Sequence, residues 1–229
     1  MKPHNNEELL RRMIVQGQLG VGQPVDVDSI RNLTGCSNAA ATDIVRVLVE
    51  EEFISSEEHK SRVRDWPSSS LAQHLDVMAA LEAEIVYELA MPHGRRVSSH
   101  LVKAAVNLNS SLKADDPYVR MQGDLDFSRS LIDMATPAAS LSYRVVAAPA
   151  VFYHAIDFYR SPEVALTPVD VHLMIEAILS HQAVRARECG ALYRRMMARY
   201  FRTEYRKSQS VRNLTPKSKK TPRAVSHEQ

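Results

Sequence analysis

Residues 25–55 read VDVDSIRNLTGCSNAAATDIVRVLVEEEFIS, and their spacing predicts two short helices joined by a tight turn. Asp26 or Asp28 can cap the first helix, and we expect Ile30 and Leu33 to be its inward residues. Gly35 supplies the turn. The second helix can be capped by Ser37 or Asn38, and its apolar stripe consists of Ala41, Ile44, Val45 and Leu48. This rhythm is typical of a helix-turn-helix.

The opposite face of the second helix is the face that enters the major groove when such a motif binds DNA. It carries Asn38, Ala39, Thr42, Asp43 and Arg46. Any small helical hairpin has a similar apolar pattern, so the motif alone leaves DNA binding and a purely structural hairpin equally open. Its neighbours favour DNA binding, because a helix is predicted before it, from Asn6 to Gln16. A two-stranded wing is predicted after it, in FISSEEHKSRVRDW at residues 53–66.

The composition indicates a mainly helical chain that can bury a sizeable core. Its 229 residues suffice for one large or two ordinary domains, and 45% of them are hydrophobic. The N-terminus lacks the apolar core of a signal peptide, and no apolar run approaches the roughly 20 residues that span a bilayer. We therefore expect a cytoplasmic protein without a membrane partner. The two cysteines, Cys36 and Cys189, fit no metal-ligand spacing and are expected to be reduced.

The positive charge of the chain is concentrated at its C-terminal end. Residues 1–64 carry 8 Lys or Arg against 10 Asp or Glu, whereas residues 202–229 carry 8 against 2. A strongly basic N-terminal domain would have been stronger evidence for a nucleic-acid partner. The polar, proline-punctuated segment at residues 204–229 is predicted to be disordered.

Two domains are predicted before that tail. Residues 1–66 form the winged helix-turn-helix, and Pro67 with the following serines marks the boundary to an all-helical bundle of about six helices at residues 67–203. The six are Leu71–Ala90, Val97–Leu112, Tyr118–Met134, a fourth that starts at Pro137 and is broken at Pro149, Val169–His181, and Gln182 to about Tyr205.

This layout resembles the GntR superfamily of transcriptional regulators, and within it the FadR branch. The resemblance covers about residues 6–202 and rests on the following stretches: the Gly17, Leu19 and Gly22 step, VRDWPSSSLAQHLDVMAALEAEIVYELA at residues 63–90, Asp124 to Ser128, and HLMIEAILSHQAVRARECGALYRRMM from His172. It implies a helical effector-binding domain of the FCD type. Double-stranded DNA, a small-molecule effector and a second copy of the chain are the partners that it implies.

The DNA-reading residues depart from those of the family. Where the family has S-R-x-P-V-R-E-A, this chain has residues 37–44, SNAAATDI, so Asn38 and Thr42 replace both arginines. Each lost arginine removes about 1–3 kcal/mol of guanine readout. Asn38 can read adenine, and Ser37 and Thr42 can bind phosphate oxygens. Further contacts are predicted for Arg46 and, on the wing, for His59, Lys60 and Arg62. Lys60 and Arg62 are equally compatible with ordinary solvated positions.

The metal site that many relatives carry is also incomplete here. The resemblance places its aspartate at Asp124, but its three histidines fall at Ser128, at Val171 or His172, and at Tyr193. Two ligands at best are too few for a structural site, so we predict no metal and no cofactor. The arginine that clamps acidic effectors in relatives corresponds to Met78. The residues predicted to line the effector cavity are therefore Asp124, Ser128, His172, Tyr193 and Met78, in a cavity that accepts a less acidic ligand, accepts a larger apolar one, or has collapsed.

No pattern in the sequence predicts an enzyme. It contains no glycine-rich phosphate loop, no nucleophile with a neighbouring base and no close metal triad. The arginines between Tyr193 and Tyr200 are expected to be solvated on a packed last helix. We therefore expect a dimeric, ligand-responsive transcriptional regulator. The alternative is a sensor or protein-interaction module that has lost specific operator reading, which the missing arginines and the acidic N-terminal domain favour.

Overall fold

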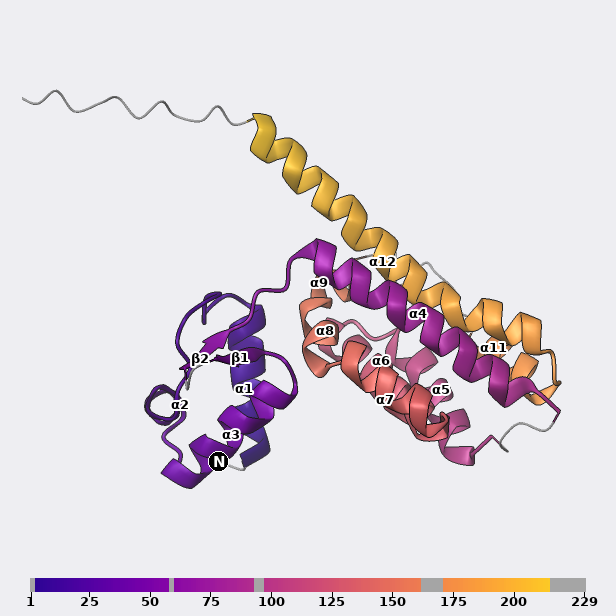
Figure 1. Cartoon of the computed structure of the whole chain (residues 1–229), viewed down its shortest axis with the longest axis horizontal. Helices are drawn as coiled ribbons and strands as arrows, with labels where there is room; N and C mark the ends of the chain where they lie inside the picture. The colour runs from indigo at the N-terminus through magenta and orange to yellow at the C-terminus, as the bar shows by residue number, and fades with distance from the viewer. Residues whose placement is uncertain (1–2, 58–59, 93–96, 162–170, 215–229) are drawn as a thin grey trace, which may run out of the picture.

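The computed structural model describes residues 3–57, 60–92, 97–161 and 171–214, which form an N-terminal lobe and a larger helical half (Figure 1). The N-terminal lobe contains α1 (Pro3–Val15), α2 (Val27–Thr34), α3 (Asn38–Glu50), β1 (Ile54–Glu57) and β2 (Lys60–Val63). The helical half contains α4 (Ser68–Ala90), α5 (Ser99–Ser111), α6 (Pro117–Met134), α7 (Pro137–Val146), α8 (Pro149–His154), α9 (Ile156–Arg160), α11 (Val171–Leu179) and α12 (Ala183–Leu214). The chain is therefore mainly α-helical, as predicted.

The helix-turn-helix forms as its sequence predicts, with one correction. Asp26 caps α2 through a reciprocal capping box with Ser29, and Gly35 ends the helix in the left-handed region at φ 67°. The hydroxyl of Ser37 accepts a hydrogen bond from the backbone and caps α3. Leu33, expected to point inward, is 45% exposed. Ile30 is the buried residue of α2 and Val27 packs beside it partly buried, so Leu33 lies outside the contact that the rest of the lobe makes with this helix.

The wing is a two-stranded antiparallel hairpin. Its register pairs Ile54 with Val63 and Glu57 with Lys60, and the chain at Pro24 makes a further bridge to Arg62. Ile54 and Val63 are buried against the helices, so the first and last residues of the hairpin anchor it to the lobe. His59, at the expected tip, lies outside the described residues.

The helical half has more helices than the six predicted, namely eight among the described residues. The segment expected as one helix with a break is divided into α7, α8 and α9. Pro149 starts α8, because proline has no N–H to continue the preceding helix but fits the first turn of a new one. The last helix, α12, extends to Leu214, past the predicted start of the tail at residue 204. Residues 215–229 of that tail are not described.

The pair formed by α4 and α12 is the spine of the helical half, and the two helices lie side by side over most of the length of α4 (Figure 1). A side chain at Gly190 would bring a Cβ atom to 2.6 Å from Val86 Cγ2 and 3.4 Å from the carbonyl oxygen of Glu82. Glycine at this position therefore allows the two helices to approach closely. None of the described helices has the length and apolarity needed to cross a membrane.

The N-terminal lobe rests on α8. The backbone N–H of Ala150 donates to the carbonyl oxygen of Glu51 at 3.1 Å, and the hydroxyl of Tyr153 donates to the carboxylate of Glu8. The ring of Trp66 stacks against that of His154, with centroids 6.0 Å apart. These contacts join the end of α3 and the middle of α1 to the helical half.

Candidate DNA-binding surface and effector cavity

The predicted reading face of α3 is solvent-exposed. Asn38, Thr42 and Arg46 are spaced four residues apart and lie on the exposed side of the helix, opposite its buried stripe. The stripe holds Ala41, Ile44 and Leu48, which pack into the lobe. The side chains of Asn38 and Arg46 are therefore presented to solvent on one helical face.

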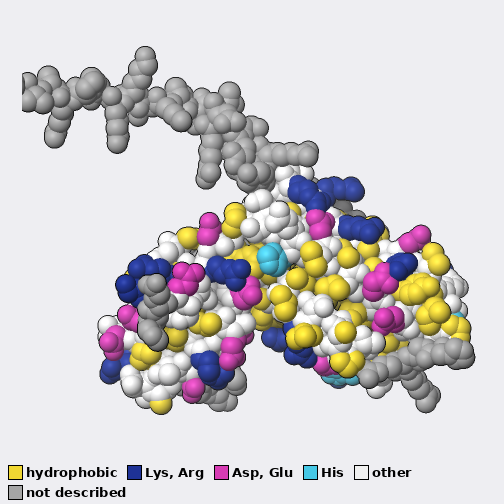
Figure 2. Space-filling model, viewed as in Figure 1, with side chains coloured by type: hydrophobic (Ala, Val, Ile, Leu, Met, Phe, Trp, Pro, Cys, Tyr) yellow, Lys and Arg dark blue, Asp and Glu magenta, His cyan; other side chains and the backbone are white. Residues whose placement is uncertain are grey.

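The charge on this face is nearly balanced. Arg46 pairs with Glu50 at 2.7 Å and with Asp43 at 4.0 Å, and all three side chains are at least 60% exposed. On the visible face of the N-terminal lobe, basic and acidic side chains are interspersed (Figure 2). A phosphate backbone approaching α3 would thus meet two carboxylates beside the one guanidinium of this helix.

Lys60 and Arg62, the two described wing residues of the predicted contact set, differ in their hydrogen bonding. Lys60 is exposed at the start of β2. The guanidinium of Arg62 donates to the carbonyl oxygen of Gly22 at 2.8 Å, so it ties the wing to the loop before α2. Its remaining donors face solvent, because the residue is exposed.

The helical half encloses an ion cluster centred on Arg194 of α12. This residue is 0% exposed, which corrects the expectation that the arginines between Tyr193 and Tyr200 are solvated; Arg195 and Arg199 of that set are exposed. The guanidinium donates from Nη1 and Nη2 to the two oxygens of Asp124, at 2.6 and 2.7 Å. It also donates from Nη2 to the Ser128 hydroxyl at 2.5 Å and from Nε to Oε1 of Glu82 at 2.9 Å.

A tyrosine hydroxyl also donates to each carboxylate. Tyr143 donates to Oε1 of Glu82, and Tyr159 donates to Asp124 at 2.5 Å. Burial raises the pKa of Glu82 above its ordinary value, although Arg194 and Tyr143 oppose this effect. Burial disfavours the charge of Arg194, but the two facing carboxylates raise its pKa well above the ordinary value. The guanidinium is thus permanently charged and bound to its partners.

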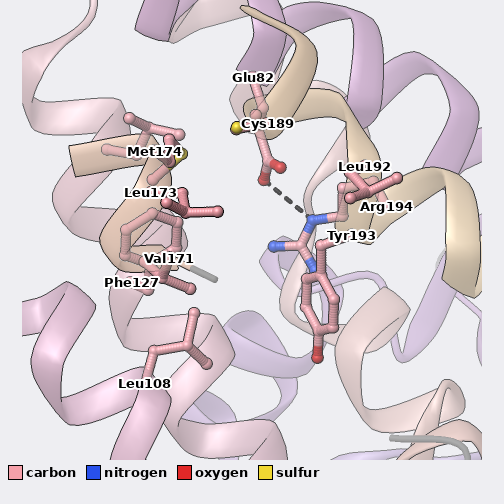
Figure 3. A pocket seen from close by; sticks show the side chains of 12 residues that line it. Glu82, Leu108, Phe127, Val171, Leu173, Met174, Cys189, Leu192, Tyr193 and Arg194 are labelled. Carbon is pink, nitrogen blue, oxygen red and sulfur yellow. Dashed lines mark hydrogen bonds and ion pairs between the residues drawn. The ribbon is translucent and has the colours of Figure 1, made fainter. Parts of the chain in front are cut away.

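A cavity of about 90 Å³ adjoins this cluster (Figure 3). Arg194 and Tyr193 lie on one side and an apolar wall from α6 and α11 lies on the other. Leu173 and Leu192, which are 37% and 58% exposed, form its outer rim. The lining residues are Glu82, Leu108, Phe127, Leu131, Val171, Leu173, Met174, Cys189, Gly190, Leu192, Tyr193 and Arg194. Ligand pockets usually measure about 300–1,000 Å³, so this cavity suits only a small molecule.

The predicted effector residues are only partly brought together. Asp124 and Ser128 meet at the Arg194 guanidinium, and Tyr193 lines the cavity. Met78 is buried in the core without lining the cavity, and His172 is exposed on the outer side of α11. The reason is the helical period: Met78 is one turn before Glu82 on α4, whereas His172 is adjacent to inward-facing Val171.

The residues present do not fit a divalent metal. Asp124 and Ser128, which the sequence resemblance associates with metal ligands, both bind the Arg194 cation. In the described parts of the chain, no group of three or more His, Cys, Asp or Glu side chains is arranged to hold a metal ion. A metal placed beside the guanidinium would also be repelled by its charge.

Sequence reasoning missed Glu82 and Arg194, although each left a signal. Glu82 interrupts the buried stripe of α4 between Met78 and Ile85, and Arg194 interrupts that of α12 between Gly190 and Met197. A single charge within the apolar face of each of two long helices indicates a buried ion pair, because an isolated buried charge is too costly.

Three solved structures share this architecture. Lar, which controls the expression of the Listeria monocytogenes agr system, superposes with a TM-score of 0.61 at 14% identity, covering 90% of this chain and 97% of that chain. A GntR transcriptional regulator from Rhodococcus sp. RHA1 gives 0.60 at 14% identity, covering 88% and 97%. E. coli McbR/YncC gives 0.54 at 14% identity, covering 89% and 98%. The fold is that of GntR-type regulators. No family model matches the sequence, and no curated protein matches it either.

Within this GntR-type fold, two helices connect the cavity to the N-terminal lobe. The start of α6 carries Tyr118, whose ring lies 4.2 Å below the guanidinium carbon of Arg12, and the same helix carries Asp124. In α8, Phe152 packs under Arg194, with 5.1 Å from the guanidinium carbon to the ring centroid. Its neighbour Tyr153 bonds to α1. Tyr118 and Tyr153 thus join α6 and α8 to α1.

Proposed function

We propose that this chain is a DNA-binding transcriptional regulator of the GntR type and the FadR branch. In this proposal, residues 1–66 bind DNA, residues 67–203 form an FCD-type effector domain, and the basic segment at residues 204–229 is an accessory tail. The observation that carries the proposal is the exposed polar face of α3, on a helix-turn-helix whose wing follows directly. The fold that the chain shares with Lar and the Rhodococcus regulator supports it.

The proposed DNA contacts divide into base reading and backbone binding. Asn38 reads adenine, and Arg46 reaches a base or a phosphate from the next turns of α3. Ser37 and Thr42 bind phosphate oxygens. Their hydroxyls also make hydrogen bonds to the backbone of α3. From the wing, Lys60, Arg62 and His59 complete the proposed contact set.

The effector is proposed to act through the cavity beside Arg194. A ligand that alters the packing of α6 or α8 changes the position of the N-terminal lobe through Tyr118 and Tyr153. Such a ligand controls DNA affinity only to the extent that it favours one arrangement of the lobe over another.

We propose a homodimer because two helix-turn-helix motifs, one from each copy, match two half-sites on DNA. Hydrophobic side chains are spread over the visible face of the helical half (Figure 2). On α7, Leu141 and Val145 lie one turn apart and are 69% and 63% exposed, which favours this face as the dimer contact. Changing both to Asp is expected to convert the dimer into a monomer in sedimentation. An unchanged dimer would place the contact elsewhere.

The decisive experiment is selection of DNA fragments from a random pool, followed by affinity measurement at a stated salt concentration. We expect a recurrent two-fold motif that the full chain prefers over random DNA by at least about a thousandfold. Asn38→Ala is expected to relax the preference at one position. Arg129→Ala, which changes an exposed arginine on α6, is the matched control. Retention without any sequence preference would overturn the proposal.

One observation favours a second candidate function. Asp43 and Glu50 flank Arg46 on the reading face and weaken attraction to phosphate. A sensor or protein-interaction module that kept the fold accounts for this charge balance. Co-purification of one stoichiometric protein partner, together with the absence of a selected DNA motif, would favour it.

A further inference from the structure

The Arg194 guanidinium has no donor left for a ligand. Nε donates to Glu82, Nη1 to Asp124 and to the sulfur of Met197, and Nη2 to Asp124 and Ser128. Every N–H group of the side chain is thus directed at a protein atom. A carboxylate entering the cavity would find a positive charge that is already neutralised. It would therefore lose its hydration without gaining a partner.

Negative charges outnumber positive charges around the cavity. Two carboxylates, Glu82 and Asp124, face the single cation of Arg194, and the three side chains are nearly inaccessible to solvent. The cluster carries one excess negative charge whenever both carboxylates are ionised. In a low-dielectric interior such an excess attracts a cation strongly and repels an anion.

One acceptor remains without a donor at the cavity. Both donors to Glu82, Tyr143 and Arg194, converge on Oε1, and within the described part of the chain Oε2 accepts no hydrogen bond. Glu82 lines the cavity and is only 3% exposed. An unpaired buried carboxylate oxygen costs free energy, which a ligand donor would recover.

The rest of the cavity wall is apolar and favours a small apolar group on the ligand. Phe127, Leu131, Val171 and Met174 face Glu82 across about 90 Å³. This volume is below the roughly 150 Å³ in which benzene fits. A short branched alkyl chain matches it better than an aromatic ring.

We infer that the cavity binds a small primary amine in its protonated form, with the ammonium group donating to Glu82 and a short alkyl chain against the apolar wall. The inference names the ligand class of the effector site, so it rests on the proposed function for its regulatory meaning. Binding itself is tested on the chain without DNA. A failed amine test therefore leaves the DNA-selection result untouched, and the reverse also holds.

The experiment compares isobutylamine, isobutanol and isobutyrate, which share one alkyl group, by calorimetry with the full chain at constant ionic strength. A hydrogen bond to a charged group is expected to make the amine bind roughly 10–100-fold more tightly than the alcohol. Isobutyrate is expected not to saturate. For a ligand of about five non-hydrogen atoms, the dissociation constant should not fall below the micromolar range.

One variant and one control test the named acceptor. Glu82→Gln is expected to reduce amine affinity to that of the alcohol, whereas Glu84→Gln, on an exposed position of the same helix, leaves it unchanged. The inference is overturned if none of the three ligands binds, if isobutyrate binds as tightly as the amine, or if a folded Glu82→Gln variant keeps the preference.

Discussion

Arg194 and Asp124 make two parallel hydrogen bonds inside the helical half, and their side chains are 1% and 0% exposed. This bidentate pair joins α12 to α6, and Glu82 joins the same guanidinium to α4. Three helices distant in sequence are thus connected through one side chain. The cluster also determines the electrostatics of the adjoining cavity, because the Arg194 guanidinium directs all its N–H groups at protein atoms and leaves none for a ligand.

Removing Arg194 is expected to destabilise the chain strongly. Arg194→Met leaves Glu82 and Asp124 buried without a counter-ion, which should lower the free energy of unfolding by about 3–5 kcal/mol. Urea unfolding followed by circular dichroism measures this difference. Arg187→Met, which breaks an exposed pair with Glu84, is the control and should cost less than about 1 kcal/mol.

Neutralising both carboxylates in the Arg194→Met variant should restore part of the lost free energy of unfolding. Glu82→Gln and Asp124→Asn, added to Arg194→Met, remove the uncompensated charges from the interior. A triple variant as unstable as Arg194→Met alone would show that packing rather than charge accounts for the loss.

Charge changes on α3 are expected to alter DNA affinity in opposite directions. Asp43→Asn and Glu50→Gln remove carboxylates near the phosphates, so affinity should rise. Arg46→Ala should weaken binding and reduce the slope of log K against log salt by about 0.9 if Arg46 contacts a phosphate. Fluorescence anisotropy over a salt series measures both effects. Asp126→Asn on α6 is the control, and an equal rise with this variant would remove the assignment to α3.

His154 is expected to make stability depend on pH. Burial lowers the pKa of His154 to about 4 from its ordinary 6.5, because its charged form would sit beside Trp66 and Phe53 without a partner at Nε2. Between pH 6.5 and 4 the unfolded chain binds a proton that the folded chain does not. Stability should therefore fall as the pH drops, by about 2 kcal/mol between pH 7 and 5.

The matched variant is His154→Phe, which keeps an aromatic ring between Trp66 and Phe53 but cannot take up a proton. Its stability should fall less than that of the natural chain over the same pH range, as measured by urea unfolding at pH 7 and 5. Identical pH profiles for the two proteins would exclude His154 as the titrating group.

Changing Tyr153 should weaken the contact between the N-terminal lobe and the helical half. Burial raises the pKa of Tyr153, so its hydroxyl stays protonated and donates to Glu8. Tyr153→Phe leaves Glu8 paired with Arg12 at 2.7 Å, so the expected loss is only about 1 kcal/mol. Hydrogen exchange should become faster in α1 and remain unchanged in α5. Equal acceleration in both helices would indicate global destabilisation instead.

The local structure of this chain follows from residues close together in its sequence. Asp26, Gly35 and Ser37 encode the ends of α2 and α3, and Pro137 and Pro149 mark the starts of α7 and α8, because caps and prolines act on the backbone within a few residues. The order of a winged helix followed by a helical half was predictable for the same reason. The exposure of Leu33 was not, since the width of a buried face depends on what packs against it.

The chemistry of the cavity depends on how the helices pack together. Glu82, Asp124 and Arg194 lie on three helices, and their separations in sequence, 112 residues from Glu82 to Arg194 and 70 from Asp124 to Arg194, exceed the reach of any periodic pattern. Met78 and His172 were predicted to line the cavity with Tyr193, but the helices carry them elsewhere. Burial and charge pairing depend on which helix faces meet, and that is a property of packing over the whole domain.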